Sequence, residues 1–145
     1  MMPTIRKLRL GAPVIAAFIL VLSVQTAAAL PIQIRVLNAK NGKRVAGQKV
    51  SVLIKGAKDA TEYTTDAEGN INVDLDPAAE VFVATEWWTP CRKVGSEIDP
   101  YVSVGEILKD GVTIENTCGR AKSETIKGTL VIFAKRPSIV QLLKK

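Results

Sequence analysis

Short segments in which apolar and polar side chains alternate dominate the sequence after position 30. The alternation occurs at 32–36, 50–54 and 71–75, and a period of two residues is typical of strands with one buried face. Val81–Ala84 is apolar throughout, which predicts a strand buried on both faces, and Thr129–Ala134 carries the strongest strand signal. Roughly six or seven short strands divided by turns predict an all-β chain that folds as a β-sandwich.

The connection Asp66–Asn70 has the composition of a hairpin turn, in which Gly69 supplies a positive φ. Its polar residues Asp66, Glu68 and Asn70 also alternate like oxygen ligands for Ca²⁺. The full Asp-x-Asp-x-Asp-Gly loop with its distant glutamate is missing, so a plain turn is the preferred interpretation. We therefore expect no metal site here.

One short helix is predicted at Ser103–Asp110, between the longer strands. Ser103 and Glu106 have the Ser-x-x-Glu spacing of a capping box, in which each side chain bonds to a free backbone N–H group of the first turn. Gly111 follows the segment at the position where a helix commonly stops.

The first 29 residues have the pattern of a cleaved secretory signal. Arg6, Lys7 and Arg9 form a basic start, residues 10–24 are almost wholly apolar, and residues 27–29 are alanines that signal peptidase accepts. We expect a signal peptide at 1–29, a single domain at 30–145, and a secreted or periplasmic protein with no stable membrane span after cleavage. The rival interpretation is an uncleaved anchor, because residues 10–30 nearly reach the length that spans a bilayer.

The complete absence of histidine from the 145 residues limits the available chemistry. Ser-His-Asp and Cys-His catalysis are excluded, and no zinc site can use imidazole. Removing Arg6, Lys7 and Arg9 with the signal leaves 17 basic against 14 acidic residues, a net charge of +3. So small a charge does not indicate a nucleic-acid partner, for which a strongly basic face is expected. No cofactor is predicted.

Cys91 and Cys118 are the two cysteines of the chain, and both follow the predicted signal. Disulfides persist in oxidising compartments, so export makes a Cys91–Cys118 bond the expected state. The alternative is two free buried thiols. A redox-active pair is not indicated, because the cysteines lack Cys-x-x-Cys spacing.

Strand alternation and turn glycines combine in one extended motif: Ile34-x-Val36-x-x-Ala39-x-x-Gly42-x-x-Val45-Ala46-Gly47-x-x-Val50-x-Val52, followed by Thr65-Asp66-x-x-Gly69-Asn70-Ile71. The motif resembles the carboxypeptidase regulatory-like group of transthyretin-like (prealbumin-like) domains. The similarity covers Ile32 to about Thr85, and Cys91–Lys145 carries no matching motif. The resemblance implies an immunoglobulin-like (prealbumin-like) β-sandwich, here with one short helix and one disulfide. It also implies a non-catalytic accessory module of an exported or surface protein.

The segment Trp87–Tyr101 breaks the strand pattern and is longer than an ordinary connection. It holds both tryptophans of the chain, Trp87 and Trp88, and tryptophan is favoured at the anchors of interfaces. We expect a non-enzymatic module that binds a protein or a cell-surface carbohydrate through this segment, with at least one exposed tryptophan. The competing interpretation is that both tryptophans fill the end of the sandwich.

Two other classes of function stay open from the sequence. A hydrolase would use carboxylates near the tryptophans, such as Glu86, Glu97 or Asp99, and two facing carboxylates in a cleft would favour it. A structural envelope protein with no specific small ligand would bury the tryptophans and present a featureless surface.

Overall fold

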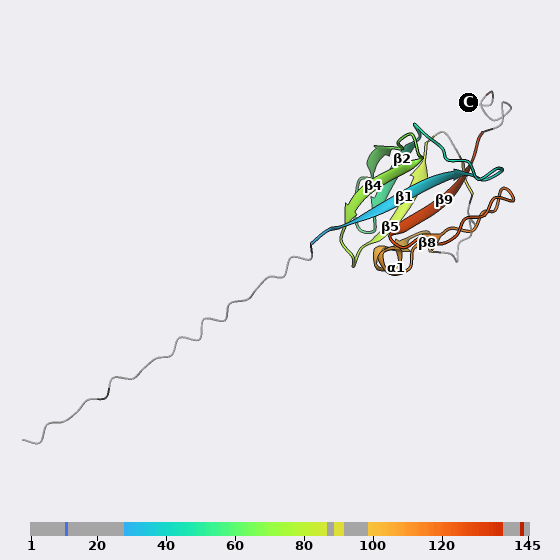
Figure 1. The fold of residues 1–145 in the computed structure, drawn as a ribbon. Coiled ribbons are helices and arrows are strands. Elements are labelled where there is room, and N and C mark those ends of the chain that lie inside the picture. The colour runs from blue at the N-terminus through green and yellow to red at the C-terminus, as the bar shows by residue number, and fades with distance from the viewer. Residues whose placement is uncertain (1–10, 12–27, 87–88, 92–98, 138–142, 144–145) are drawn as a thin grey trace, which may run out of the picture.

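Two β-sheets and one short helix make up the regular structure of the described residues, as Figure 1 shows. The computed structural model describes residues 11, 28–86, 89–91, 99–137 and 143. The predicted signal segment lies almost wholly outside these residues. In the part of the chain that is described, no helix combines the length and the apolar character needed to cross a membrane. The mostly β fold with two sheets and one helix confirms the class of fold that the sequence predicts.

The larger sheet has five strands, and β1 and β9 lie at its centre. Its order is β4 (Asn70–Leu75), β1 (Leu30–Asn38) and β9 (Thr129–Lys135), with β6 (Thr89–Pro90) and β8 (Val112–Thr113) both paired to β9. β1 is antiparallel to β4 but parallel to β9, so that strands from opposite ends of the predicted domain lie side by side.

The smaller sheet has four strands, in the order β3 (Thr61–Thr64), β2 (Lys49–Ile54), β5 (Glu80–Thr85) and β7 (Val102–Ser103). All of its pairings are antiparallel. The helix α1 (Val104–Lys109) follows β7 directly and buries Val104 and Ile107.

The main core contains side chains from both sheets, contributed by alternate positions of β1, β2, β4, β5 and β9. Successive side chains of a strand point to opposite faces, so the inward residues of β1 are apolar while Gln33 and Arg35 face outward. Full burial of one such aliphatic side chain stabilises the fold by about 1.5–3 kcal/mol. The buried strand residues of this core include Ile32, Ile34, Val36, Val50, Val52, Ile71, Val73, Leu75, Val81, Val83, Leu130 and Ile132.

The prediction that Val81–Ala84 is buried on both faces is wrong. Val81 and Val83 are buried in the main core, whereas Phe82 and Ala84 are only partly buried. The smaller sheet contributes to the core with one face only, and Phe82 lies on the other face. There it packs against Tyr101, with the two ring centroids 6.1 Å apart.

The predicted helix is confirmed, with its regular part at Val104–Lys109. Ser103 is the N-cap, and its Oγ accepts a hydrogen bond from the Glu106 backbone N–H at 3.4 Å. Gly111 follows the helix with a φ of +80°, as expected for the residue that stops it.

The tight turn predicted at Asp66–Asn70 is confirmed, but the prediction of a hairpin is wrong, because the turn joins β3 of the smaller sheet to β4 of the larger sheet. Gly69 has a φ of +73°. Asp66 Oδ1 accepts hydrogen bonds from the backbone N–H groups of Glu68 at 2.8 Å and Asn70 at 3.0 Å. The carboxylate therefore holds the backbone of the turn, which is the plain-turn interpretation of this segment.

Candidate binding site beside the disulfide

The outer face of the larger sheet carries a second, smaller apolar cluster. Leu37 of β1 and Phe133 of β9 are register neighbours on this face, and Val131 takes the outward position before Phe133. Their exposed fractions are 6%, 2% and 0%. Such burial on an outer face requires a cover, and Cys91 and Ala121 pack onto these side chains.

The disulfide predicted between Cys91 and Cys118 is present, with the Cα atoms 5.4 Å apart. Cys91 is buried and continues the pairing of β6 with β9, because its N–H donates to the Phe133 carbonyl at 2.9 Å. Cys118 is exposed and lies in the segment that follows β8. The bond therefore ties residues 114–123, here called the clamp segment, to the edge of the larger sheet.

The Asn116 side chain organises the clamp segment from within. Its Nδ2 donates to the carbonyls of Ala39 at 2.8 Å and Ala121 at 3.0 Å. Its Oδ1 accepts from the backbone N–H groups of Cys118 and Gly119, each at 3.1 Å. One amide side chain thus joins both ends of the loop around Cys118 to the residue that follows β1. This arrangement restricts the backbone independently of the disulfide.

A surface groove of about 660 Å³ lies between the clamp segment and the end of β9. It is lined by residues 113–116 and 119–123 together with Phe133. Ile114 contributes apolar surface, Phe133 lies almost wholly buried beneath the groove, and Asn116 and Ser123 contribute polar groups. The groove therefore offers both apolar and polar contacts. Its residues Thr113 and Phe133 belong to the paired strands β8 and β9.

Positive charge predominates at the rim of the groove. Arg120 and Lys122 are exposed, and neither forms an ion pair within the described residues. Glu115 also lines the groove and has an interaction partner of its own. On β8, the Thr113 Oγ1 is buried without a hydrogen-bond partner in the described part of the chain. The groove thus offers cationic side chains to a ligand.

A second set of contacts holds Tyr101, the last residue of the segment Trp87–Tyr101. Lys55 Nζ lies 3.0 Å from Glu80 Oε2 and 3.4 Å from Asp99 Oδ2. The same ammonium group lies 5.4 Å from the centroid of the Tyr101 ring. The hydrogen bond from the Tyr101 N–H, followed by the contact with Lys55, lowers the pKa of Asp99. The contacts of Glu80 and Asp99 raise the pKa of Lys55.

The structure describes only some of the site residues that were predicted from the sequence. Trp87, Trp88 and Glu97 lie outside the described residues. Glu86 is exposed and pairs with Lys49 at 3.6 Å, whereas Asp99 pairs with Lys55. The two carboxylates of the hydrolase interpretation that are described therefore each face a lysine. No group of three metal-binding side chains occurs within the described ranges.

The groove and the second cluster were not predicted from the sequence. The available signal is in β9, where all residues from Thr129 to Ala134 are buried. Val131 and Phe133 alternate with Leu130 and Ile132, so both faces of this strand are apolar. Such a strand needs a cover on each face, and the segment that contains the second cysteine provides one of them.

Comparison with known proteins gives no matching family model, no matching curated protein and no matching solved structure. The carboxypeptidase regulatory-like resemblance of residues 32–85 therefore stays a prediction from the motif.

Proposed function

We propose that the chain is an exported, non-enzymatic module that binds a protein or a cell-surface glycan. Its binding surface consists of the groove beside Phe133 together with the segment Trp87–Tyr101. In this proposal the sandwich has the immunoglobulin-like, prealbumin-like topology of the carboxypeptidase regulatory-like group. It forms a single domain at 30–145 behind a signal peptide at 1–29.

The groove is the observation that carries the proposal. Its volume of about 660 Å³ falls within the range of ligand sites, which combine apolar lining with a few placed polar groups. Ile114 supplies apolar surface, and Arg120 and Lys122 supply exposed charges that form no ion pair in the described part of the chain. The disulfide and Asn116 restrict the clamp segment, so less ordering is needed when a partner binds.

The anchoring of the tryptophan segment supports the second part of the surface. Cys91 follows Trp88 closely in the sequence and is held by the disulfide and by β9. Tyr101 is held by Phe82 and Lys55. Binding residues are concentrated on loops that a rigid framework positions, and the described contacts attach this segment to the framework at Cys91 and at Tyr101.

The disulfide also supports export. Such bonds form and persist in secreted and periplasmic proteins and are rare in reducing compartments. The Cys91–Cys118 bond lies over the second apolar cluster, so it acts as part of the fold.

The hydrolase alternative has less support from the carboxylates that are described. Asp99 is paired with Lys55, and its pKa is lowered chiefly by the hydrogen bond from the Tyr101 N–H, whereas a carboxylic acid that donates a proton near neutral pH needs a raised pKa. Glu86 is exposed and paired with Lys49.

Substitution of each tryptophan tests the proposal, because Trp87 and Trp88 are the two tryptophans of the chain. We expect Trp87→Ala or Trp88→Ala to reduce capture of a partner from a cell-envelope extract. The free energy of unfolding of that variant should change by less than about 0.5 kcal/mol, as for most surface substitutions. Replacing a tryptophan that fills the core would instead lower the free energy of unfolding by about 3–5 kcal/mol. Losses of that size in both variants would contradict a binding role for the segment.

A further inference from the structure

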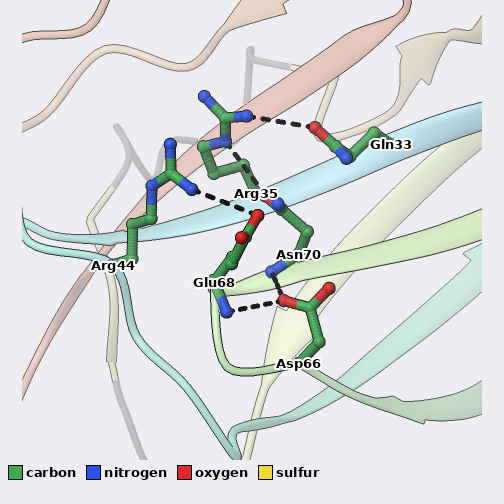
Figure 2. A network of polar contacts seen from close by, with 6 residues as sticks. All are labelled: Gln33, Arg35, Arg44, Asp66, Glu68 and Asn70. Atoms are coloured by element: carbon green, nitrogen blue, oxygen red, sulfur yellow. Dashed lines mark hydrogen bonds and ion pairs between the residues drawn. The ribbon is translucent and has the colours of Figure 1, made fainter.

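A second polar site lies on the outer face of the larger sheet, on the β4 side of β1. Figure 2 shows Arg35 of β1 held between two neutral amide side chains. Its Nε donates to Asn70 Oδ1 at 3.0 Å, and one terminal nitrogen donates to Gln33 Oε1 at 3.1 Å. The two acceptors fix the guanidinium group without neutralising its charge.

The position of Asn70 is itself fixed. Asn70 is the register neighbour of Arg35 on β4, and its side chain and backbone are only 5% exposed. Its backbone N–H donates to Asp66 Oδ1 at 3.0 Å, within the turn that Gly69 closes. A chain of hydrogen bonds therefore runs from the turn to the guanidinium group of Arg35, as Figure 2 shows.

A second guanidinium group approaches the same turn. Arg44 forms an isolated bridge with Leu37, which shares the outer face of β1 with Arg35, and the Arg44 Cβ lies beside Gly69. Arg44 pairs with the Glu68 carboxylate at 3.5 Å, and these side chains are 48% and 72% exposed. Exposed ion pairs of this kind are weak, so Arg44 can exchange Glu68 for another anion.

The remaining N–H groups of Arg35 have no acceptor in the described part of the chain, and no carboxylate pairs with it there. A planar guanidinium group with free N–H groups on one edge matches the oxygen pairs of carboxylate and phosphate groups. Holding it with neutral amides keeps both its charge and its orientation available to a ligand.

We propose that Arg35 and Arg44 bind an oxyanion group of a ligand, either a carboxylate or a phosphate. Arg35 is the fixed donor, and Arg44 is the second donor that turns from Glu68 to the anion. This site is separate from the groove, because Val131 of β9 lies between Arg35 and Thr113 in the register of the sheet. A purely structural role is the alternative, since the Arg35 side chain is also placed to cover Val131, which is fully buried.

Titration with inorganic phosphate, and separately with acetate, tests the proposal through the side-chain Nε–H resonance of Arg35. We expect a saturable shift of this resonance in the intact protein, and a weaker response at higher salt because Arg44 is exposed to solvent. The anion with the stronger response identifies the kind of oxyanion that is preferred. Arg35→Gln should weaken binding, followed then on the Arg44 resonance, by about tenfold or more, as for loss of a charge-assisted hydrogen bond.

Glu68→Gln separates a binding site from a structural one, because it removes the carboxylate that competes for Arg44. Binding should tighten by about two- to fivefold, which corresponds to release of one exposed ion pair. Glu62→Gln is the matched control, since Glu62 is exposed on β3 of the other sheet, and it should leave the affinity unchanged. The absence of a saturable shift with both anions, or equal affinity of Glu68→Gln and wild-type protein, would overturn the proposal.

Discussion

Gly119 lies so close to the backbone of Ala39 that a β-carbon at position 119 would overlap the Ala39 carbonyl oxygen. The same carbonyl accepts hydrogen bonds from Asn116 Nδ2 at 2.8 Å and from the Ala121 N–H at 3.2 Å. The peptide group of Ala39, directly after β1, therefore holds the clamp segment in place by hydrogen bonds and by close packing. Because this segment forms one wall of the groove, the shape of the groove depends on this contact.

Gly119→Ala should destabilise the protein by about 1–3 kcal/mol, the usual cost of forcing an extra group into a packed site. The added methyl group would push the clamp segment away from Ala39 and break the hydrogen bonds there. Thr117→Ala is the control, because Thr117 is exposed in the same segment and should change stability by less than about 0.5 kcal/mol. Denaturant unfolding measures both, and equal stabilities would show that Gly119 is not required.

Removing the disulfide should cost about 2–5 kcal/mol of unfolding free energy, as for native bridges of small exported domains. Cys118→Ala makes the change at the exposed end of the bond and leaves the packing around buried Cys91 intact. Thermal unfolding of this variant, compared with the wild-type protein before and after reduction, measures the loss. Labelling of free thiols at both cysteines in the folded, non-reduced protein would contradict the bond.

Gly69→Val should destabilise the protein by about 1–3 kcal/mol through backbone strain, because Gly69 has a φ of +73°. A β-carbon there would also lie 2.9 Å from the Val45 backbone nitrogen and 3.1 Å from the Val36 carbonyl oxygen. Ala67→Val places the same side chain at an exposed position of the turn without a positive φ. An unchanged melting temperature for Gly69→Val would show that the turn tolerates the strain.

Much of the fold could be predicted from local signals. The alternation at 32–36 and 71–75, the N-cap serine Ser103 and the positive φ of Gly69 each depend on neighbouring residues. All of these were confirmed. The parallel pairing of β1 with β9 was not predicted, because it joins segments far apart in the chain and no local pattern specifies the partner of a strand.

The arginine site and the groove were less predictable, because each of them joins segments that are far apart in the sequence. Arg35 and Asn70 are separated by 35 positions and meet only because β1 pairs with β4. The groove depends on the return of the clamp segment to Ala39, which the Asn116 side chain brings about. The sequence pointed to the cysteines, but not to the apolar face that their bond covers.

The shifted pKa values of Asp99 and Lys55 predict how the stability of the protein changes with pH. The pKa of Asp99 is lowered from its ordinary value of 3.8, so its contribution to stability is present above this value and is lost as the pH falls through the folded-state pKa. The pKa of Lys55 is raised from 10.5, so its contribution is present below this value and is lost as the pH rises through the folded-state pKa.

Lys55→Met should raise the pKa of Asp99 only part of the way to its ordinary value, because the hydrogen bond from Tyr101 is the larger cause of the shift. Carboxyl resonances followed by NMR during an acid titration measure this change. Full recovery of the ordinary value in Lys55→Met would mean that the lysine alone holds the pKa down.

Site-specific photo-cross-linking tests the central claim most directly, namely that the groove beside the disulfide is a binding surface. A photoreactive amino acid in place of Lys122 would lie at the rim of the groove, and the same substitution at exposed Lys58, between β2 and β3, is the control. In cells that produce the protein, we predict a discrete cross-linked product with a protein or glycan partner from position 122 and none from position 58. The absence of a product at 122, or the same product from both positions, would contradict the assignment of the groove as the binding surface.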